Sequence, residues 1–435
     1  MSHRSALLVI AVLAVLAYLP AFQLSFIADD FPQIQMSRTV ENPGGLAVLM
    51  ASPIAQTRIT FFVLTDVVDR LAGLNPKFYH GVAVGVHVLC CWLVYALGIW
   101  KLIGRKVSII AACFFAVFEG HQEAVMWYSA IMETLLFLFG VGAMLCLIQW
   151  LRGKGWIYYG LALVSFGLAL LSKESGYIYA ALMALPVIEM STGEKHAGRR
   201  RSLLGLMPFV VIGVAYVVWI ALGRVSNPRF LDGSFAVSWH FPRVLAESFG
   251  RLLFVWGLLA LAALGIFRAL TYVRLVVYSV VWMLIGLIPY SFLTYLNRVP
   301  SRHTYLPSVG LALLVGAAMV CVWERLGGRL VLAIGAVILM VNVTILWRKK
   351  AEQYQTRALP TDMLINAVRR ADGPIHIRCY PYIPLVAESA AREFGGMVVF
   401  EEDPKQKNEG RCLNFWYKDT LGNVREVFVP PARLP

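Results

Sequence analysis

Long apolar segments recur along almost the whole chain, and short polar segments separate them. Eleven such segments stand out, and the two shortest reach full length only with flanking polar residues. They span residues 6–24, 80–100, 107–118, 134–151, 156–171, 176–190, 203–222, 248–267, 273–292, 305–323 and 330–347. A bilayer core of roughly 30 Å needs a helix of about 20 mostly apolar residues. The pattern therefore predicts an all-α polytopic membrane protein with about 11 transmembrane helices.

Lysine and arginine are unevenly distributed over the connections between these segments. With the N-terminus placed inside, every inner connection is basic, as short cytoplasmic loops usually are. The basic residues of these connections are Lys101, Arg105, Lys106, Arg152, Lys154, Lys195, Arg199, Arg200, Arg201, Arg268, Arg274, Arg325 and Arg329. This arrangement predicts a cytoplasmic N-terminus and, with an odd number of spans, a C-terminal segment on the outer side. In a bacterial inner (cytoplasmic) membrane, the outer side is the periplasm.

Two long polar segments lie on the predicted outer side. The first outer loop, residues 25–79, contains a stretch at 57–71 whose mixture of apolar and charged residues predicts an amphipathic helix on the membrane surface. Residues 348–435 predict a small periplasmic α/β domain, which follows a transmembrane domain of residues 1–347. The elements expected in the α/β domain are helices at 361–370 and 385–394, strands at 375–380 and 397–401, and a hairpin of 412–418 with 424–429.

The cysteines leave open whether the C-terminal domain contains a disulfide. Cys379 and Cys412 fall in predicted strands of the α/β domain, and in an oxidising compartment they are able to form a disulfide. Because the sequence does not give the distance between them, the pairing stays open. The other cysteines lie within apolar segments, as small core residues do. No CxxC motif or Cys/His cluster indicates a zinc site.

Composition and charge narrow the class of protein. Apolar residues make up 59% of the chain and the mean hydropathy is +0.68, whereas soluble domains contain about 45–50% apolar residues. The net charge of +14 on its own suits a nucleic-acid-binding protein. We reject that function because the basic residues lie in loops where membrane orientation requires them. The expected partner is a lipid bilayer, and no nucleic acid.

Ionisable residues concentrate on the predicted outer side. They are Asp29, Asp30, Arg58, His121, Glu123, Glu133, Lys173, Glu174, Arg298, Arg302 and His303. A transporter is expected to carry such groups near the middle of its spans, where this chain has few. The distribution favours a site at the outer membrane surface.

The residue types at this surface suit a lipid-linked phosphate substrate. Arginine binds phosphate oxygens through a planar fork, so Arg298 and Arg302, together with His303, are candidates for phosphate binding. Asp29 or Asp30 is able to accept a proton from an attacking hydroxyl. Asp29 and Asp30, with His121 as an extra ligand, are also able to bind a divalent metal such as Mg or Mn, and the sequence leaves that cofactor undecided.

Each candidate also has an ordinary structural explanation. An acidic pair often begins a turn, a lysine and a glutamate can form an ion pair at the end of a span, and a buried histidine can be held by hydrogen bonds. Glutamates at the surface can cap helices, and arginines in an outer loop can contact water or lipid headgroups. The residues alone do not decide between these roles and a functional site.

Four stretches of the chain resemble the GT-C class of membrane glycosyltransferases, in particular its protein O-mannosyltransferase-like and TMTC-like branch. Residues 26–31 (FIADDF) look like the acidic motif of that family's first outer loop. Residues 119–127 (EGHQEAVMW) look like its H-P-x-x-x-E-A-V-x-W segment, and 170–176 (LLSKESG) like its S-K-E-x-G span end. Residues 302–310 (RHTYLPSVG) look like E-R-Y-x-Y-L-P-S-x-G, with His303 in place of the usual aromatic residue and Ser301 in place of the usual acid.

The resemblance implies an enzyme that moves a sugar from a polyprenyl-phosphate donor to a hydroxyl of an outer acceptor, which is a glycan, a lipid or a protein. It also implies inversion at the sugar carbon. Asp29 or Asp30 would be the acidic site residue, and Arg302, with Lys173, would face the donor phosphate. Arg58 resembles the family's arginine after the first loop, although Ile59 stands where the family has proline.

The remaining motif residues, His121, Glu123, Glu174 and Tyr305, are further site candidates by this resemblance. Glu133, which follows the second stretch on the predicted outer side, is another candidate. A 34-residue repeat, which TMTC-like members carry after the membrane domain, is missing from this sequence. That favours a bacterial type of the family. Two other functions stay open: a transporter or flippase of lipid-linked substrates, and a membrane scaffold whose C-terminal domain binds a partner.

Overall fold

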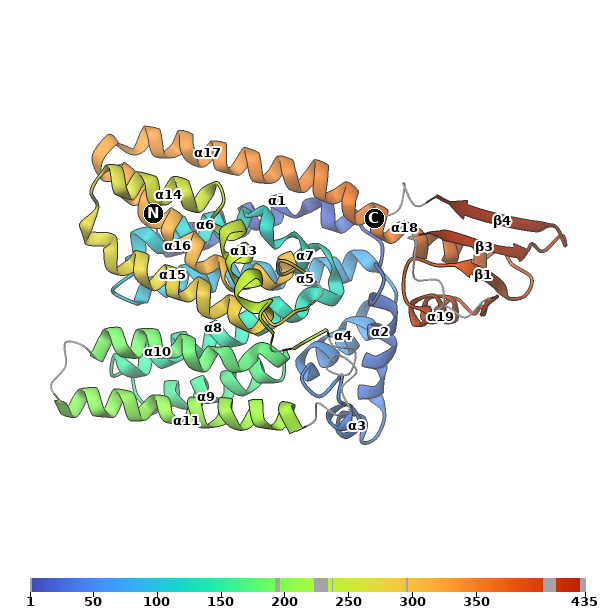
Figure 1. Ribbon diagram of the computed structural model, residues 1–435, viewed down its shortest axis with the longest axis horizontal. Helices are drawn as coiled ribbons and strands as arrows, with labels where there is room; N and C mark the ends of the chain where they lie inside the picture. Colours follow the sequence, from blue (N-terminus) through green and yellow to red (C-terminus); the bar gives the residue numbers. More distant parts are fainter. Residues whose placement is uncertain are drawn as a thin grey trace.

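The computed structural model describes residues 2–191, 196–222, 234–236, 238–294, 296–401 and 412–430. It shows a long bundle of helices with a small sheet domain at one end (Figure 1). Of the predicted inner-loop residues, Lys195 and the side chain of Arg199 lie outside this described part of the chain.

Each of the eleven predicted apolar segments forms a helix. These helices are α1 (His3–Ala17), α5 (Pro76–Ala96), α6 (Gly104–Val117), α8 (Ile131–Leu151), α9 (Trp156–Leu170), α10 (Ile178–Ser191), α11 (His196–Leu222), α13 (Phe241–Leu253) with α14 (Trp256–Ile266), α15 (Val273–Leu287), α16 (Ser308–Leu326) and α17 (Gly328–Thr344). The predicted fold class, an all-α polytopic membrane protein with a small C-terminal α/β domain, is therefore confirmed.

Not all of these helices span a bilayer by length and composition. Within the described ranges, 6 helices are long and apolar enough to cross a membrane, or up to 8 if each bent pair forms one span. The helices α1 and α9 are shorter apolar helices of 15 residues each, about 22 Å long at 1.5 Å per residue. They need flanking residues to reach across the roughly 30 Å core. The chain is thus a multi-pass membrane protein, with fewer full-length spans than the predicted eleven.

One predicted span is broken. The segment 248–267 was expected to be a single helix, but α13 ends at Leu253 and α14 begins at Trp256, and the two axes differ by 69°. The break lies at Val255, whose φ is +66°, a value that a β-branched residue rarely adopts. Hydropathy does not register such a local backbone change, because both sides of the break remain apolar.

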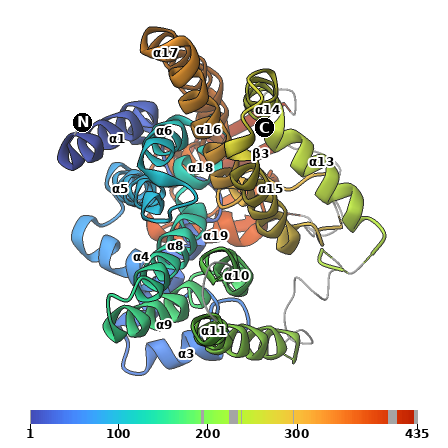
Figure 2. The ribbon, with the colours of Figure 1, turned by 90° about the vertical axis from the view of Figure 1, so that its left-hand side faces the viewer.

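Helices at the centre of the bundle are distinguished by burial. Most residues of α8 and α16 are buried, whereas most residues of α11 and α17 are exposed. Seen along the bundle, α6, α8 and α16 lie toward the middle, and α1, α9, α11 and α17 lie at the periphery (Figure 2). Two glycines of α16 permit its close packing. A Cβ at Gly310 would lie 2.3 Å from the carbonyl oxygen of Ser279, and one at Gly316 would lie 2.7 Å from that of Val107.

The first outer loop folds into the short helices α2 (Asp30–Ser37), α3 (Gly45–Ala51) and α4 (Ile59–Ala72). The helix α4 matches the helix predicted at 57–71. Its buried face includes Phe61 and Phe62, and its opposite face exposes Val67 and Leu71. A second short helix, α7 (Gln122–Met126), follows α6 after a bend of 55°.

The C-terminal domain continues directly from the last apolar helix. A helix of 41 residues runs from Gly328 to Val368 and joins α17, a π-helical turn (Ile345–Lys350) and α18 (Ala351–Val368). The predicted boundary between residues 347 and 348 falls inside this continuous helix. Since the helix passes from the bundle into the core of the sheet domain, it fixes where the domain begins (Figure 1).

The remaining elements of this domain match the prediction closely. They are β1 (Ile375–Cys379), α19 (Pro384–Glu393), β2 (Val398–Phe400), β3 (Leu413–Lys418) and β4 (Val424–Val429). The strand order is β2-β1-β3-β4, with β1 parallel to β2 and the other pairs antiparallel. Residues of α18 and α19, including Leu364 and Ala391, pack with Ile377 and Phe415 in one buried cluster. Cys379 and Cys412 form a disulfide, with Cα atoms 5.7 Å apart.

The sheet domain is attached to the first outer loop by polar and aromatic contacts. Arg38, directly after α2, forms ion pairs with Asp69 of α4 at 2.7 Å and with Glu393 of α19 at 2.8 Å. The rings of Phe31 and Phe394 meet edge to face at 6.3 Å. Helix α2 is therefore held from two sides, by the membrane bundle and by the C-terminal domain.

We expect the disulfide to stabilise the C-terminal domain alone. A Cys379→Ser/Cys412→Ser variant lacks the crosslink between these residues. Loss of a disulfide typically lowers the free energy of unfolding by about 2–4 kcal/mol. Limited proteolysis of the full-length protein should therefore cut faster after residue 370, while the membrane helices stay protected. The matched control is Cys113→Ser, which removes a free cysteine in α6. Equal cleavage rates in the wild type and the double variant would contradict this expectation.

Candidate active site

A cavity of about 1060 Å³ opens at the end of the bundle that faces the first outer loop. It is formed where α2, the start of α8, the turn between α9 and α10, the end of α11 and the segment before α16 meet. Its lining residues are Asp29, Gln33, Arg58, Trp127, Ser129, Ala130, Met132, Glu133, Lys173, Glu174, Ser175, Tyr177, Val217, Ile220, Ala221, Ser234, Phe235, Ala236, Pro289, Tyr290, Phe292, Leu293, Arg302 and His303.

The lining divides into two kinds of surface. Seven of the residues singled out in the sequence line the cavity: Asp29, Arg58, Glu133, Lys173, Glu174, Arg302 and His303. The end of α11 and the segments 235–236 and 289–293 add an apolar and aromatic wall that includes Val217 and Ile220. The cavity therefore offers charged groups beside an apolar surface, which suits a molecule with a charged head and a hydrocarbon chain.

Asp29 reaches the cavity because of the backbone just before it. Ala28 has a φ of +44°, which is unusual for a residue other than glycine. The chain turns here, with the amide of Asp30 donating to the carbonyl of Ile27 at 3.1 Å. Asp29 is then the residue that precedes α2, and its side chain is half-buried in the cavity wall. Backbone strain of this kind is often found at functional sites.

Asp30 has a different environment and does not line the cavity. It is fully buried, and its carboxylate accepts from the Ile27 amide at 2.8 Å, the Ser129 amide at 2.8 Å and the Ser129 hydroxyl at 2.5 Å. Burial raises the pKa of Asp30 to about 6, and these hydrogen bonds oppose that rise. Asp30 ties the first outer loop to the segment after α7 and so holds Asp29 in place.

A buried network centres on Glu133, in the first turn of α8. One of its oxygens accepts from Lys173 Nζ and lies 2.5 Å from His303 Nδ1, and the other accepts from the Tyr290 hydroxyl at 3.0 Å. The Tyr290 hydroxyl also bonds Ser175 Oγ at 2.7 Å. Each of these five residues is less than a tenth exposed. Because a buried charge needs a compensating partner, this network fixes four separate chain segments relative to one another.

The imidazole of His303 is held in a defined orientation. It stacks on the Tyr290 ring with centroids 4.0 Å apart and planes 11° apart. Its Nδ1 lies 2.5 Å from the Glu133 carboxylate and 3.3 Å from Lys173 Nζ. Burial lowers the pKa of His303 to about 4, which leaves the ring neutral at neutral pH. Burial likewise lowers the pKa of Lys173, and the Glu133 carboxylate opposes that shift.

Arg302 is held by Glu123. That carboxylate accepts from the Arg302 guanidinium, from its backbone amide at 3.2 Å and from the Ser301 hydroxyl at 2.9 Å. The guanidinium also lies 5.4 Å from the centre of the Trp127 ring. Glu123 does not line the cavity itself, so its observed role is to orient Arg302.

Arg58 and Glu174 complete the charged part of the cavity. The guanidinium of Arg58 is buried and bonds the Glu174 carboxylate at 3.2 Å. Within the described chain, its Nε–H is buried without a hydrogen-bond partner. A buried donor without a hydrogen-bond partner lowers the stability of the folded protein.

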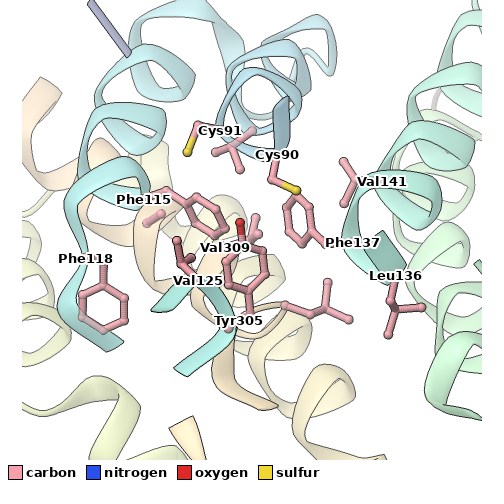
Figure 3. Packing of buried hydrophobic residues seen from close by; sticks show 14 of the residues in the cluster. Cys90, Cys91, Phe115, Phe118, Val125, Leu136, Phe137, Val141, Tyr305 and Val309 are labelled. Carbon is pink, nitrogen blue, oxygen red and sulfur yellow. The ribbon is translucent and has the colours of Figure 1, made fainter. Parts of the chain in front are cut away.

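The other predicted site residues lie away from the cavity. Arg298 is exposed and not part of the lining. Tyr305 points into the apolar core near Phe115 and Phe137 (Figure 3), and its hydroxyl bonds His87 Nδ1 at 2.7 Å. His121 is fully buried beside it and bonds the Ser308 hydroxyl at 2.6 Å. Both side chains are thus held by hydrogen bonds in the core, which is the structural explanation that the sequence left open for His121.

The predicted metal ligands do not form a common site. Both oxygens of Asp30 are engaged by N–H and O–H donors, and His121 is bonded to Ser308 inside the bundle. In the part of the chain that the structure describes, no group of three or more His, Cys, Asp or Glu side chains is arranged to hold a metal ion. Asp29, Asp30 and His121 therefore do not form one shared metal site.

Three residues at the site were not singled out in the sequence. Trp127 lies in one of the motif stretches, so the resemblance could have identified it as a site residue. No motif contains Tyr290 or Arg357, which lie at the end of a predicted span and in α18, so the sequence did not mark them. Arg357 nevertheless reaches the site, with its guanidinium 4.8 Å from the centre of the Trp127 ring.

Comparisons with known proteins are limited to structure. No family model matches the chain, and no curated protein matches its sequence. One similar structure is the Archaeoglobus fulgidus oligosaccharyltransferase tethered to an acceptor peptide with an NVT sequon, with a TM-score of 0.55 and 12% identity over 94% of this chain. The match covers 64% of that enzyme, so this chain spans less than two thirds of its length.

A second similar structure is closer in size. It is ArnT from Cupriavidus metallidurans bound to undecaprenyl phosphate, with a TM-score of 0.52 and 14% identity, covering 93% of this chain and 88% of that chain. At these identities the likeness concerns the fold, and it does not distinguish the O-mannosyltransferase-like branch from others. The chain has the fold of the GT-C membrane glycosyltransferases.

Proposed function

We propose that the protein is a membrane glycosyltransferase that moves a sugar from a polyprenyl-phosphate donor to a hydroxyl group of an acceptor. The observation on which this rests is the cavity that combines Asp29, three cationic side chains and an apolar wall. The acceptor is a glycan, a lipid or a protein. In this proposal the cavity faces the periplasm of a bacterial inner membrane, the N-terminus is cytoplasmic, and the C-terminal domain is periplasmic.

The cationic residues suit the phosphate of the donor. Arg302 is oriented by Glu123, and Lys173 by Glu133, so both charges are held before a substrate binds. Arg58, which is paired with Glu174, adds a third cationic side chain at the same cavity. Charges fixed in advance stabilise a leaving phosphate without rearrangement during the reaction. Arg298 is given no part in this binding, because it lies outside the cavity lining.

Asp29, rather than Asp30, is the proposed general base. Asp29 lines the cavity, whereas the oxygens of Asp30 are engaged by three donors. The acceptor oxygen forms a bond to the anomeric carbon as the bond from that carbon to the phosphate oxygen breaks. Its proton passes to Asp29, and the electron pair leaves on the phosphate. A single displacement of this kind inverts the configuration, and no step is assigned to a metal.

The test of the class of enzyme is a transfer assay. Purified protein in lipid vesicles receives radiolabelled polyprenyl-phosphate sugars, with crude cell envelope as acceptor. Label that moves from the lipid to another molecule supports the proposal. Label that crosses the bilayer without a new glycosidic bond would support the transporter instead.

We expect Asp29→Asn to lower the transfer rate by roughly 100-fold or more, because a positioned general base commonly contributes that much. Its thermal stability should stay near that of the wild type, since Asp29 is half-buried at the cavity. Asp30→Asn is the matched variant. It leaves one buried donor without an acceptor and should lower stability by about 1–3 kcal/mol. A fully active Asp29→Asn protein would rule out this base.

We further expect the Lys173–Glu133 pair to determine both stability and donor binding. Glu133→Gln removes the charge that compensates the buried Lys173. Such a change typically lowers the free energy of unfolding by about 3–5 kcal/mol. Lys173→Met/Glu133→Leu removes both charges and should recover part of that stability, yet donor binding should remain lost. Thermal unfolding and binding of a labelled donor measure the two effects.

The control for this pair is Lys106→Met, which breaks an exposed ion pair with Glu324 on the other side of the bundle. Exposed pairs contribute only about 0–1 kcal/mol, so neither measurement should change. Donor binding by the double variant at the wild-type level would show that Lys173 does not contact the phosphate.

A further inference from the structure

A second cavity, of about 470 Å³, lies where α8 ends and α9 and α11 begin. Its lining residues are Trp150, Trp156, Tyr159, Arg200, Arg201, Leu204 and Gly205. Helix α8 connects the two cavities, with Glu133 in its first turn and Trp150 in its last. Trp150 lies 17 positions after Glu133, which corresponds to about 26 Å along the helix axis. The second cavity therefore lies close to a full hydrocarbon thickness away from Glu133, toward the opposite end of the membrane bundle.

Three aromatic rings form one wall of this second cavity. The ring centres are 4.8 Å apart for Trp150 and Tyr159, 5.6 Å for Trp150 and Trp156, and 5.5 Å for Trp156 and Tyr159. The Tyr159 hydroxyl donates to the carbonyl of Gly205 at 2.8 Å. A Cβ at position 205 would lie 2.4 Å from the Trp150 ring, so the close approach of α11 requires glycine there. The wall is thus fixed by packing and by a hydrogen bond.

The polar groups at this cavity are donors. The guanidinium of Arg201 lies 5.7 Å from the centres of both tryptophan rings. Arg200 is exposed beside it, and within the described ranges neither arginine forms an ion pair. The indole N–H of Trp150 is buried without a partner among the described residues, on a side chain that is 6% exposed. Two cations and an unused N–H select for an anion, and they disfavour a cationic ligand.

The surroundings favour an anion that carries hydrocarbon. Trp156, Ile157 and Leu204 are 65%, 70% and 57% exposed, so apolar surface continues from the cavity along α9 and α11. Tryptophan, tyrosine and arginine together are typical of the headgroup level of a bilayer. A soluble anion would not contact this apolar surface, whereas the acyl chains of a lipid would cover it.

We propose that this second cavity binds the phosphate headgroup of an anionic membrane phospholipid from the leaflet opposite the candidate active site. Arg200 and Arg201 would contact the phosphate, and the Trp150 N–H would donate to one of its oxygens. The acyl chains would lie on Trp156 and Leu204. This site would hold α8, α9 and α11 together at that surface, and it does not depend on the proposed transferase activity.

The test is native mass spectrometry of the delipidated full-length protein, titrated with phosphatidylglycerol or with phosphatidylcholine of the same acyl chains. Each basic residue near a membrane surface contributes about 1 kcal/mol toward anionic lipid, so the first phosphatidylglycerol should bind roughly tenfold or more tightly than phosphatidylcholine. Arg200→Gln/Arg201→Gln should abolish this preference. Trp150→Phe, which keeps a ring and removes the N–H, should weaken it a few-fold.

The matched control is Arg152→Gln/Lys154→Gln, which removes two exposed charges from the neighbouring connection and leaves the cavity lining unchanged. It should keep the preference. An equal loss in the control would show general surface attraction and would overturn the proposal, as would an unchanged preference in the Arg200/Arg201 variant. Displacement of the lipid by inorganic phosphate alone would identify a site for a free anion and would also overturn it.

Discussion

The candidate active site depends most on the buried ion pair between Glu133 and Lys173. Neither charge is stable in the bundle without the other, and His303 and Tyr290 use the remaining hydrogen-bonding capacity of the carboxylate. The pair therefore brings the start of α8, the turn after α9 and the segment before α16 to a single point. Because the lysine is held by buried partners, its ammonium faces the cavity in a defined position before any substrate arrives.

Asp30 plays the corresponding part for the first outer loop. Its hydrogen bonds to Ile27 and Ser129 fix the strained turn that presents Asp29. Helix α2 is held further by Arg38, which pairs with Glu393 in the C-terminal domain. The acidic residue at the cavity is thus supported by the membrane bundle on one side and by the sheet domain on the other. A disturbance in either part would reach Asp29 through a few named contacts.

Much of this architecture follows from patterns in the sequence, and the exceptions have physical causes. Apolar runs identify the helices, and strand periodicity identifies the C-terminal sheet, because burial depends on regular spacing. The same patterns miss the break at Val255, which changes one backbone angle within an apolar stretch. Adjacent Asp29 and Asp30 look equivalent in sequence and differ only in the three-dimensional contacts of their oxygens. Tyr290 and Arg357 join the site from distant segments, so no local motif marks them.

The central claim is that the donor phosphate binds between Arg302 and Lys173 with its sugar facing Asp29. An electron cryomicroscopy structure with a non-transferable polyprenyl-phosphate sugar analogue tests it most directly. The account predicts phosphate density within hydrogen-bonding distance of both cations, the prenyl chain along the wall formed by Val217 and Ile220, and the anomeric carbon toward Asp29. Phosphate bound outside the cavity, for example at Arg298, with Asp29 remote from the sugar, would contradict the account.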